Sequence, residues 1–266
     1  MKKKHILGAF DWFLISGVVA CNVIYSIATA SSGFDVLGFT AAVAGILCVV
    51  LAAKGSIWNY AFGIVQVSLY AYIAWKSTAY GNAAVNALYY FPMQFIGWWQ
   101  WSRRGAGTGT EAGNAVESRR LSWKMRALIA AGIAVVSVAL AFVLKHFGAE
   151  QPWIDSFTTV LCIAAQALMT FAFVEQWWLW IVFNVFTVIM WSVFAAEGTE
   201  HSVPTLIMYV FYLMNSVNGL VNWRRLERGE AKGEGCFAKY VYVGKETDCQ
   251  REDCVIPAPA GRLPLL

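Results

Sequence analysis

Aromatic and amide side chains recur at helical spacing inside long apolar segments of this chain. The segment 177–196 carries four of them at spacings of three, four and seven residues: Trp177, Trp180, Asn184 and Trp191. Residues at these spacings share one face of a helix. Because an unpaired amide is costly in hydrocarbon, this face is expected to point inward. The indoles of Trp180 and Trp191 and the amide of Asn184, at mid-membrane depth, exceed what packing requires, and they predict a ligand-binding face.

Three further segments carry residues of the same kinds. In one of them, Asn86, Tyr90 and Gln94 follow one another at four-residue steps and share a helix face. The other two segments contribute Phe62 and Gln66, and Tyr212, Asn215 and Asn218. Aromatic faces stack on rings and attract cations, and amides pair with hydroxyl and carboxamide groups. Together these residues predict a substrate-binding site for a neutral or cationic, ring-bearing, hydroxylated small molecule.

Charged and catalytic groups are missing from the same segments. No Asp, Glu, Lys or Arg lies in the middle of an apolar segment, although carriers driven by protons or sodium commonly place carboxylates there. Without intramembrane Arg or Lys, a phosphorylated substrate has no charged partner. The sequence also lacks a Gly-rich phosphate loop, histidine pairs at metal spacing and a nucleophile–base set. We therefore expect a passive carrier, not an enzyme, with no cofactor and no metal.

The composition shows what kind of fold must position these residues. Of the 266 residues, 59% are hydrophobic and 14% are charged, whereas a soluble domain usually carries about 25% charged residues. Apolar runs of about 20 residues match the thickness of a hydrocarbon core. They predict an all-α integral membrane protein, lying in a lipid bilayer, with spans at 10–30, 35–53, 57–75, 82–101, 123–144, 154–173, 177–196 and 202–223.

The basic residues lie beside the span ends, where they act as topology signals. The net charge of +4 therefore gives no reason to expect a nucleic-acid partner. Arg103 and Arg119 place the stretch from Ser102 to Ser122 in the cytoplasm, and its glycines predict a flexible, solvated linker. Arg224 and Arg225 place the C-terminus on the same side, and Lys2 to Lys4 place the N-terminus there if the first segment spans. The alternative is a signal peptide cleaved near Ala28-Thr29-Ala30.

Part of the sequence repeats at a step of 122 residues. Trp58 and Trp101 correspond at this step to Trp180 and Trp223. Setting the first segment aside, three spans, one connecting span and three further spans remain. Because three plus one is even, both triplets enter the membrane in the same direction, which predicts parallel repeats with the substrate between them. Departures from the repeat, Phe62 against Asn184 and Leu69 against Trp191, are expected to mark the site. The tryptophans at span ends are expected to be interfacial anchors: Trp58, Trp98, Trp99, Trp101 and Trp223.

Three runs of residues resemble the PnuC family of bacterial vitamin transporters. They are Trp58-Asn59-Tyr60-Ala61-Phe62-Gly63, the run from Tyr89 to Trp99, and the run from Gln176 to Asn184. The similarity covers about residues 35–225 and places the Trp-x-x-Trp motif of the family on Trp177 and Trp180. It implies a three-plus-one-plus-three fold related to the SWEET sugar transporters. The first segment is not part of this shared core and is expected to form an additional N-terminal helix. The resemblance also implies homotrimers in the bacterial inner membrane.

The same resemblance implies that the substrate is nicotinamide riboside. Facilitated diffusion would be made directional by a cytoplasmic kinase that phosphorylates the product. The riboside carries a cationic pyridinium, a carboxamide and ribose hydroxyls but no phosphate, which fits the residues described above. The alternatives are a transporter of another ring-bearing vitamin, thiamine or riboflavin, or a sensor that binds the ligand without moving it.

These expectations divide the chain into five regions. Residues 1–33 hold the additional N-terminal helix, 34–101 the first three-helix bundle, 102–150 the cytoplasmic linker and connecting helix, 151–223 the second three-helix bundle, and 224–266 a largely disordered cytoplasmic tail. The tail contains Cys236, Cys249 and Cys254 without a nearby histidine. This is a poor zinc pattern, so free thiols are expected.

Overall fold

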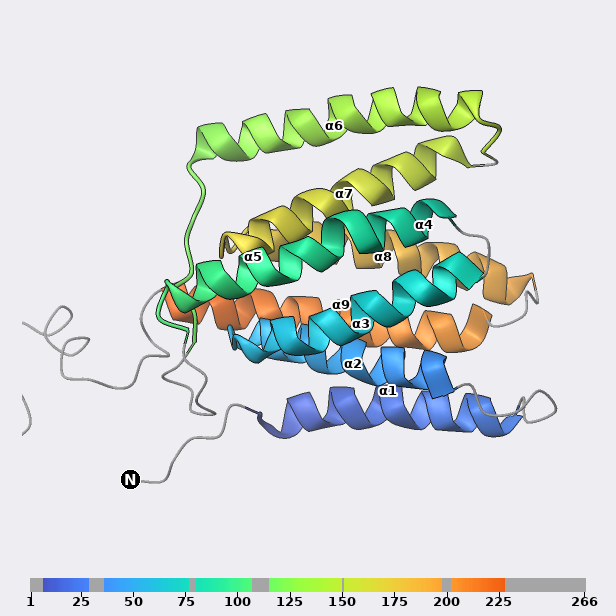
Figure 1. The fold of residues 1–266 in the computed structure, drawn as a ribbon, viewed down its shortest axis with the longest axis horizontal. Coiled ribbons are helices and arrows are strands. Elements are labelled where there is room, and N and C mark those ends of the chain that lie inside the picture. The colour runs from blue at the N-terminus through green and yellow to red at the C-terminus, as the bar shows by residue number, and fades with distance from the viewer. Residues whose placement is uncertain are drawn as a thin grey trace, which may run out of the picture.

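The computed structural model describes residues 7–28, 36–76, 80–106, 115–149, 151–197 and 202–227. Within these ranges the chain forms helices that run roughly side by side (Figure 1). The predicted disordered tail lies outside the described residues from position 228 onward, and so do Thr29 and Ala30 of the alternative cleavage site.

Each predicted span coincides with helical structure. The continuous helices are α1 (Ala9–Ala28), α2 (Val36–Ala53), α3 (Trp58–Lys76), α6 (Trp123–His146), α7 (Pro152–Thr170), α8 (Gln176–Ala196) and α9 (Ser202–Glu227). The segment predicted at 82–101 is divided into α4 (Tyr80–Val85), the π-helix η2 (Asn86–Tyr90) and α5 (Phe91–Ser102). Among the described helices, α2, α6, α7 and α8 are long and apolar enough to cross a membrane by length and composition. The count of eight spans stays a prediction.

The helices pack in a closed circuit. Helix α3 contacts α2 on one side and η2 with α5 on the other, and α8 likewise contacts α7 and α9. Contacts between α2 and α9, and between α5 and α7, join these two sets, which we call the first half (α2, α3 and the segment from α4 to α5) and the second half (α7, α8 and α9). Outside the circuit, α6 packs on α7, and α1 packs on α2 and α9 (Figure 1). Side chains from both sets can therefore meet inside the circuit.

The turn after α2 and the turn after α7 are built alike. Gly55 and Ala172 both adopt a positive φ, 69° and 61°, and each donates its amide to the carbonyl three residues earlier at 2.9 Å. A left-handed residue commonly ends a helix, and glycine adopts it without the strain that Ala172 bears. The amides of Val116 and Arg119 bind the carbonyls of Gly55 and Ala172 at 2.9 and 2.7 Å. Helices α2 and α7 therefore end at the same end of the molecule, which we call the linker end.

The predicted step of 122 residues is wrong for the first and second helices of the two halves. Gly55 and Ala172, the left-handed residues of the two turns, are 117 residues apart. Tyr60 and Trp177 are also 117 residues apart, and their rings are equivalent: the Tyr60 ring lies where a Cβ on Gly97 would stand, and the Trp177 ring lies where a Cβ on Gly219 would stand. Only the third helices keep the step of 122, as Gly97 and Gly219 show. The five additional residues of the second half lie at the end of α8 and in its connection to α9.

This shift removes two comparisons made from the sequence. Trp58 does not correspond to Trp180, and the predicted oppositions of Phe62 to Asn184 and of Leu69 to Trp191 are out of register. A sequence with 13 tryptophans offers chance matches at many offsets, and an alignment without gaps hides a five-residue insertion.

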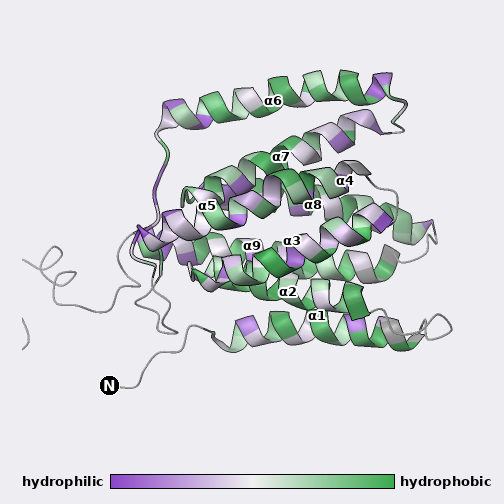
Figure 2. Ribbon diagram, in the orientation of Figure 1, coloured by the Kyte–Doolittle hydropathy of each residue, from purple (hydrophilic) through white to green (hydrophobic). Residues whose placement is uncertain are grey.

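The described part of the linker is docked instead of being a free, solvated segment. Val116 is fully buried, and Ala106 and Ala115 are almost fully buried. Arg120 pairs with Glu227 at 3.0 Å, and Arg126 pairs with Glu175 at 2.6 Å. The expected flexibility therefore fails for 103–106 and 115–122, while 107–114 lies outside the described residues. In Figure 2 hydrophilic residues are concentrated along this linker.

Helix α1 is fixed at the linker end by a buried carboxylate. Asp11 is fully buried, accepts the amide of Gly8 at 2.7 Å and pairs with Lys54 at 2.8 Å. Asn218 of α9 donates to its other oxygen at 3.5 Å. Asp11 therefore joins α1 to the turn after α2 and to α9.

Candidate functional site

A cluster of tyrosines lies inside the circuit, between the two sets of helices. The Tyr90 side chain of η2 and the Cys162 thiol of α7 lie close enough to influence each other electrostatically. Tyr209 of α9 lies close enough to Cys162, Tyr70 and Tyr212 for electrostatic interaction. Its ring centroid is 6.0 Å from that of Tyr212. Tyr90 of η2, Tyr209 and Tyr212 of α9 and the Cys162 thiol of α7 therefore lie in one region, which we call the tyrosine cluster, while Tyr70 of α3 is 45% exposed at its edge.

The π-helix η2 is what brings Tyr90 to this cluster. Pro92, at the start of α5, has no amide hydrogen, and its ring conflicts with the carbonyl four residues earlier. The chain widens there, so that the Phe91 amide binds the Asn86 carbonyl, five residues back. Such wide turns inside helices are frequent at functional sites. The predicted inward face is confirmed: Asn86 and Gln94 are buried and Tyr90 is half-buried.

Gln66 and Tyr212 meet at a close approach of α2. The tip of Tyr212 and the side chain of Gln66 are the nearest atoms to Gly45, at 3.1 and 3.5 Å from the position a Cβ would take. Glycine at this position lets residues of α3 and α9 lie directly against the α2 backbone. The structure therefore brings together two residues that the sequence placed on different candidate faces.

The amides of α8 and α9 are tied to neighbouring helices. Asn184 is buried and donates to the Ser216 hydroxyl of α9 at 3.0 Å, while Ser216 donates to the Tyr212 carbonyl at 2.9 Å. Asn215 donates to the Val49 carbonyl of α2 at 2.9 Å, and its amide oxygen is buried without a partner among the described residues. Asn184 and Asn215 thus face the interior, as predicted, and each already uses one donor within the protein.

Five of the predicted residues lie apart from this group or have other neighbours. Trp177 is buried at the linker end with its ring 6.1 Å from Trp223, and Trp180 packs on the same hydrophobic cluster. Trp191 is half-buried beside Phe194. Asn218 binds Asp11, as described above. Phe62 is half-buried and stacks on no other ring among the described residues. The predicted stripe on α8 is therefore divided between the linker end and the interior.

Two tryptophans predicted to be interfacial anchors are fully buried instead. Trp101 and Trp223 have no exposed surface, and their rings lie 5.4 Å apart. The anchor prediction fails for them because each crosses to the opposite half of the molecule. Trp58 and Trp99 remain substantially exposed, as an interfacial position requires.

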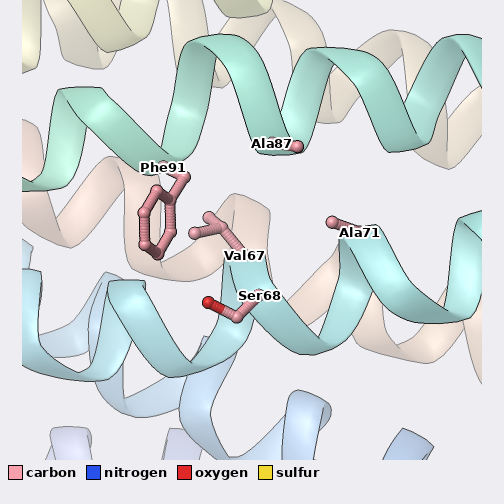
Figure 3. Close-up of a pocket in the computed structure, with 5 residues that line it drawn as sticks. All are labelled: Val67, Ser68, Ala71, Ala87 and Phe91. Atoms are coloured by element: carbon pink, nitrogen blue, oxygen red, sulfur yellow. The ribbon is translucent and has the colours of Figure 1, made fainter.

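An apolar groove lies outside the tyrosine cluster, between α3 and the segment from η2 to α5. It has a volume of about 350 Å³ and is lined by Val67, Ser68, Ala71, Ala87 and Phe91 (Figure 3). None of the predicted substrate-binding residues lines it. The Ser68 hydroxyl donates to the Ile64 carbonyl of its own helix at 2.7 Å, so the groove presents little unpaired polarity.

Sequence reasoning missed several residues of the interior. Tyr209 stands three residues before Tyr212 on the same face of α9, a spacing that could have identified it. Ser216, four residues after Tyr212, carries the same signal. Thr187 of α8 is buried three residues after Asn184. Cys162 gave no signal, because a single thiol in an apolar span is usually a packing residue.

Comparison with known proteins shows what this arrangement is similar to. A family model described as nicotinamide mononucleotide transporter matches residues 35–225. The nicotinamide riboside transporter PnuC of Neisseria mucosa is 42% identical over 84% of this chain and 85% of its own length. PnuC of Haemophilus influenzae is 33% identical over 71% of this chain and 80% of its length. A crystal structure of the vitamin B3 transporter PnuC matches with a TM-score of 0.69 at 36% identity, covering 84% of this chain and 94% of that one.

Proposed function

We propose that this chain, which belongs to the nicotinamide mononucleotide transporter family, carries nicotinamide riboside across the membrane by facilitated diffusion. The observation that supports the substrate best is the tyrosine cluster together with the interior amides. A cationic pyridinium is attracted to the faces of Tyr90, Tyr209 and Tyr212. Ribose hydroxyls and the carboxamide pair with the buried amides of Asn184, Gln94 and Asn215.

The packing of the helices supports movement of the two halves about this site. Within each half, the middle helix, α3 or α8, contacts the helices on both of its sides. The two halves meet where α2 contacts α9 and where α5 contacts α7. We propose that rocking along these two contacts exposes the interior to each side in turn, with a cytoplasmic kinase removing the product. The linker end faces the cytoplasm in this proposal, since its arginines follow the positive-inside rule. We further propose homotrimers in the bacterial inner membrane, with both termini cytoplasmic.

Uptake into proteoliposomes tests this function. The protein is reconstituted without ion gradients, and uptake of labelled nicotinamide riboside is followed to equilibrium. Transport should occur and should stop at equal concentrations, and a strict need for a proton or sodium gradient would contradict facilitated diffusion. Competition by thiamine, riboflavin and nicotinamide mononucleotide identifies the substrate. Mononucleotide binding as tight as riboside binding would contradict the choice of an unphosphorylated substrate.

A further inference from the structure

Four aromatic rings from both halves form a continuous column at the linker end. The column runs Tyr60, Trp101, Trp223, Trp177, with successive ring centroids 4.9, 5.4 and 6.1 Å apart. None of the four side chains is more than 3% exposed. We call this column the aromatic plug. It closes the interior at the end where the chain turns after α2 and α7.

Two hydrogen bonds join the plug to the opposite half of the molecule. The Trp101 indole at the end of α5 donates to the Met169 carbonyl of α7 at 3.0 Å. The Trp223 indole near the end of α9 donates to the Ala52 carbonyl of α2 at 2.8 Å. Both acceptors belong to the last turn of a helix, and each also accepts the amide of the residue three positions later, Gly55 or Ala172. Each bond therefore ties the third helix of one half to the first helix of the other.

The docked linker crosses the same end and holds both turns. Val116 binds the turn at Gly55, and Arg119 exchanges hydrogen bonds with Ala172 and Val174 at 2.7 and 2.9 Å. The Glu175 carboxylate accepts the Leu121 amide at 3.2 Å and pairs with Arg126. Separation of the two halves at this end would have to break these contacts as well as the indole bonds.

Buried polar atoms without partners lie within the plug and beside it. Among the described residues they include the Tyr60 hydroxyl and the Trp177 indole N–H of the plug itself, and the amide oxygens of Gln94 and Asn215. The Gln94 oxygen and the Cys48 sulfur are both close neighbours of Gly63. Buried polar atoms are usually paired, and unpaired ones call for a specific cause. A path that takes up water or solute hydroxyls when the plug opens provides that cause.

We propose that the aromatic plug is the gate of the transport path at the linker end, held shut by the two indole bonds and by the docked linker. The inference rests on the proposed function only in taking the interior to be a path for solute. It assigns to Trp101 and Trp223 a role in opening rather than in binding. Cys48, on the interior side of the plug, can report that opening.

Thiol modification of Cys48 from the linker side tests the gate. The other cysteines are replaced except Cys249 in the tail, whose reaction with a membrane-impermeant reagent identifies vesicles with the linker side accessible. Trp101→Phe and Trp223→Phe each keep a ring but lose the indole donor. Each should raise the Cys48 modification rate about five- to tenfold, since a net hydrogen bond is worth about 1 kcal/mol. Glu175→Gln should also raise the rate through the linker.

Trp123→Phe is the matched control, because this tryptophan is 78% exposed at the start of α6 and lies outside the plug. Its Cys48 rate should equal that of the parent chain. Unchanged rates in both plug variants and in Glu175→Gln would overturn the gate, as would an equal rise in the control. Nicotinamide riboside binding is measured by calorimetry on the same samples. Raised Cys48 rates without riboside binding would leave the gate standing and contradict the substrate, whereas binding with unchanged rates would contradict the gate alone.

Discussion

The indole ring of Trp101 lies 5.4 Å from that of Trp223, and each of the two residues donates its N–H to a backbone carbonyl of the opposite half. The two residues are equivalent at the step of 122 that relates the third helices. Their acceptors, Met169 and Ala52, are 117 residues apart. These two hydrogen bonds therefore reflect both spacings of the repeat, 122 residues between the donors and 117 residues between the acceptors. They also fix how the halves meet at the linker end.

The glycines beside the plug should be sensitive to the addition of one methyl group. A Cβ on Gly97 would overlap the Tyr60 ring, and one on Gly219 would overlap the Trp177 ring. Gly97→Ala and Gly219→Ala should each destabilise the fold by about 1–3 kcal/mol, the usual cost of overpacking. Thermal unfolding in detergent measures this as a lower apparent Tm.

Gly132→Ala is the control for these two variants. Gly132 lies in α6 with nothing within 4 Å of the added atom. Alanine is also a better helix former than glycine, by about 1 kcal/mol. Its apparent Tm should stay the same or rise, and a fall as large as that of the plug variants would contradict the packing described for Gly97 and Gly219.

The positions of the helices follow from the sequence because length and hydropathy determine a membrane-spanning helix largely by themselves. The division at η2 was not predicted, although Pro92 marks where the helix must widen. Burial of Trp101 was also missed. A tryptophan at a span end predicts an interfacial anchor. Only the hydrogen bond to the Met169 carbonyl, 68 residues away in the sequence, shows that Trp101 is buried between helices.

The candidate site was predictable to a similar extent. The inward faces of η2, α5, α8 and α9 can be predicted from the helical spacing of their amide and aromatic residues, because an unpaired amide is costly in hydrocarbon. Which of these faces meet depends on which residues of the two halves correspond. The five-residue insertion changes that correspondence, and the amino-acid composition does not reveal it. Trp177 was assigned to the ligand because it shares a helix face with Asn184, but its ring packs against Trp223.

Asn184 should matter for riboside binding through its position between α8 and α9. Asn184→Ala removes an amide whose N–H holds Ser216, and leaves that hydroxyl without its donor. The affinity for nicotinamide riboside should fall about tenfold or more, since a substrate hydroxyl or carboxamide that loses the Asn184 amide is left buried and unpaired, at a cost of about 1–3 kcal/mol. Calorimetry measures the change directly. Asn22→Ala on α1, which removes an amide bound to the Val18 carbonyl of its own helix, should leave the affinity unchanged.

The ring of Tyr209 should contribute more to binding than its hydroxyl. Tyr209→Phe keeps the aromatic face for the pyridinium, so the affinity should change by no more than a few-fold. Tyr209→Leu removes that face and should weaken binding about tenfold, because a desolvated cation–π contact is worth about 2 kcal/mol. Tyr72→Leu on the exposed side of α3 provides the comparison. Equal losses in the Phe and Leu variants would show that the ring is not in contact with the cation.

The ion pair between Asp11 and Lys54 should stabilise the position of α1. Asp11→Asn keeps an oxygen that can accept the Gly8 amide but leaves Lys54 without its carboxylate, and Lys54→Gln leaves the buried carboxylate without its cation. Each single variant should lower stability by about 1–3 kcal/mol, below the 3–5 kcal/mol of a fully buried pair, because the Lys54 side chain is 21% exposed. The double variant should cost less than the sum of the two, since neither charge is then left alone.

Arg120→Gln is the exposed control. It breaks the pair with Glu227, in which the arginine is 55% exposed, and should change stability by less than about 1 kcal/mol. Strict additivity of the Asp11 and Lys54 variants in apparent unfolding free energy would rule out a direct interaction between the two residues.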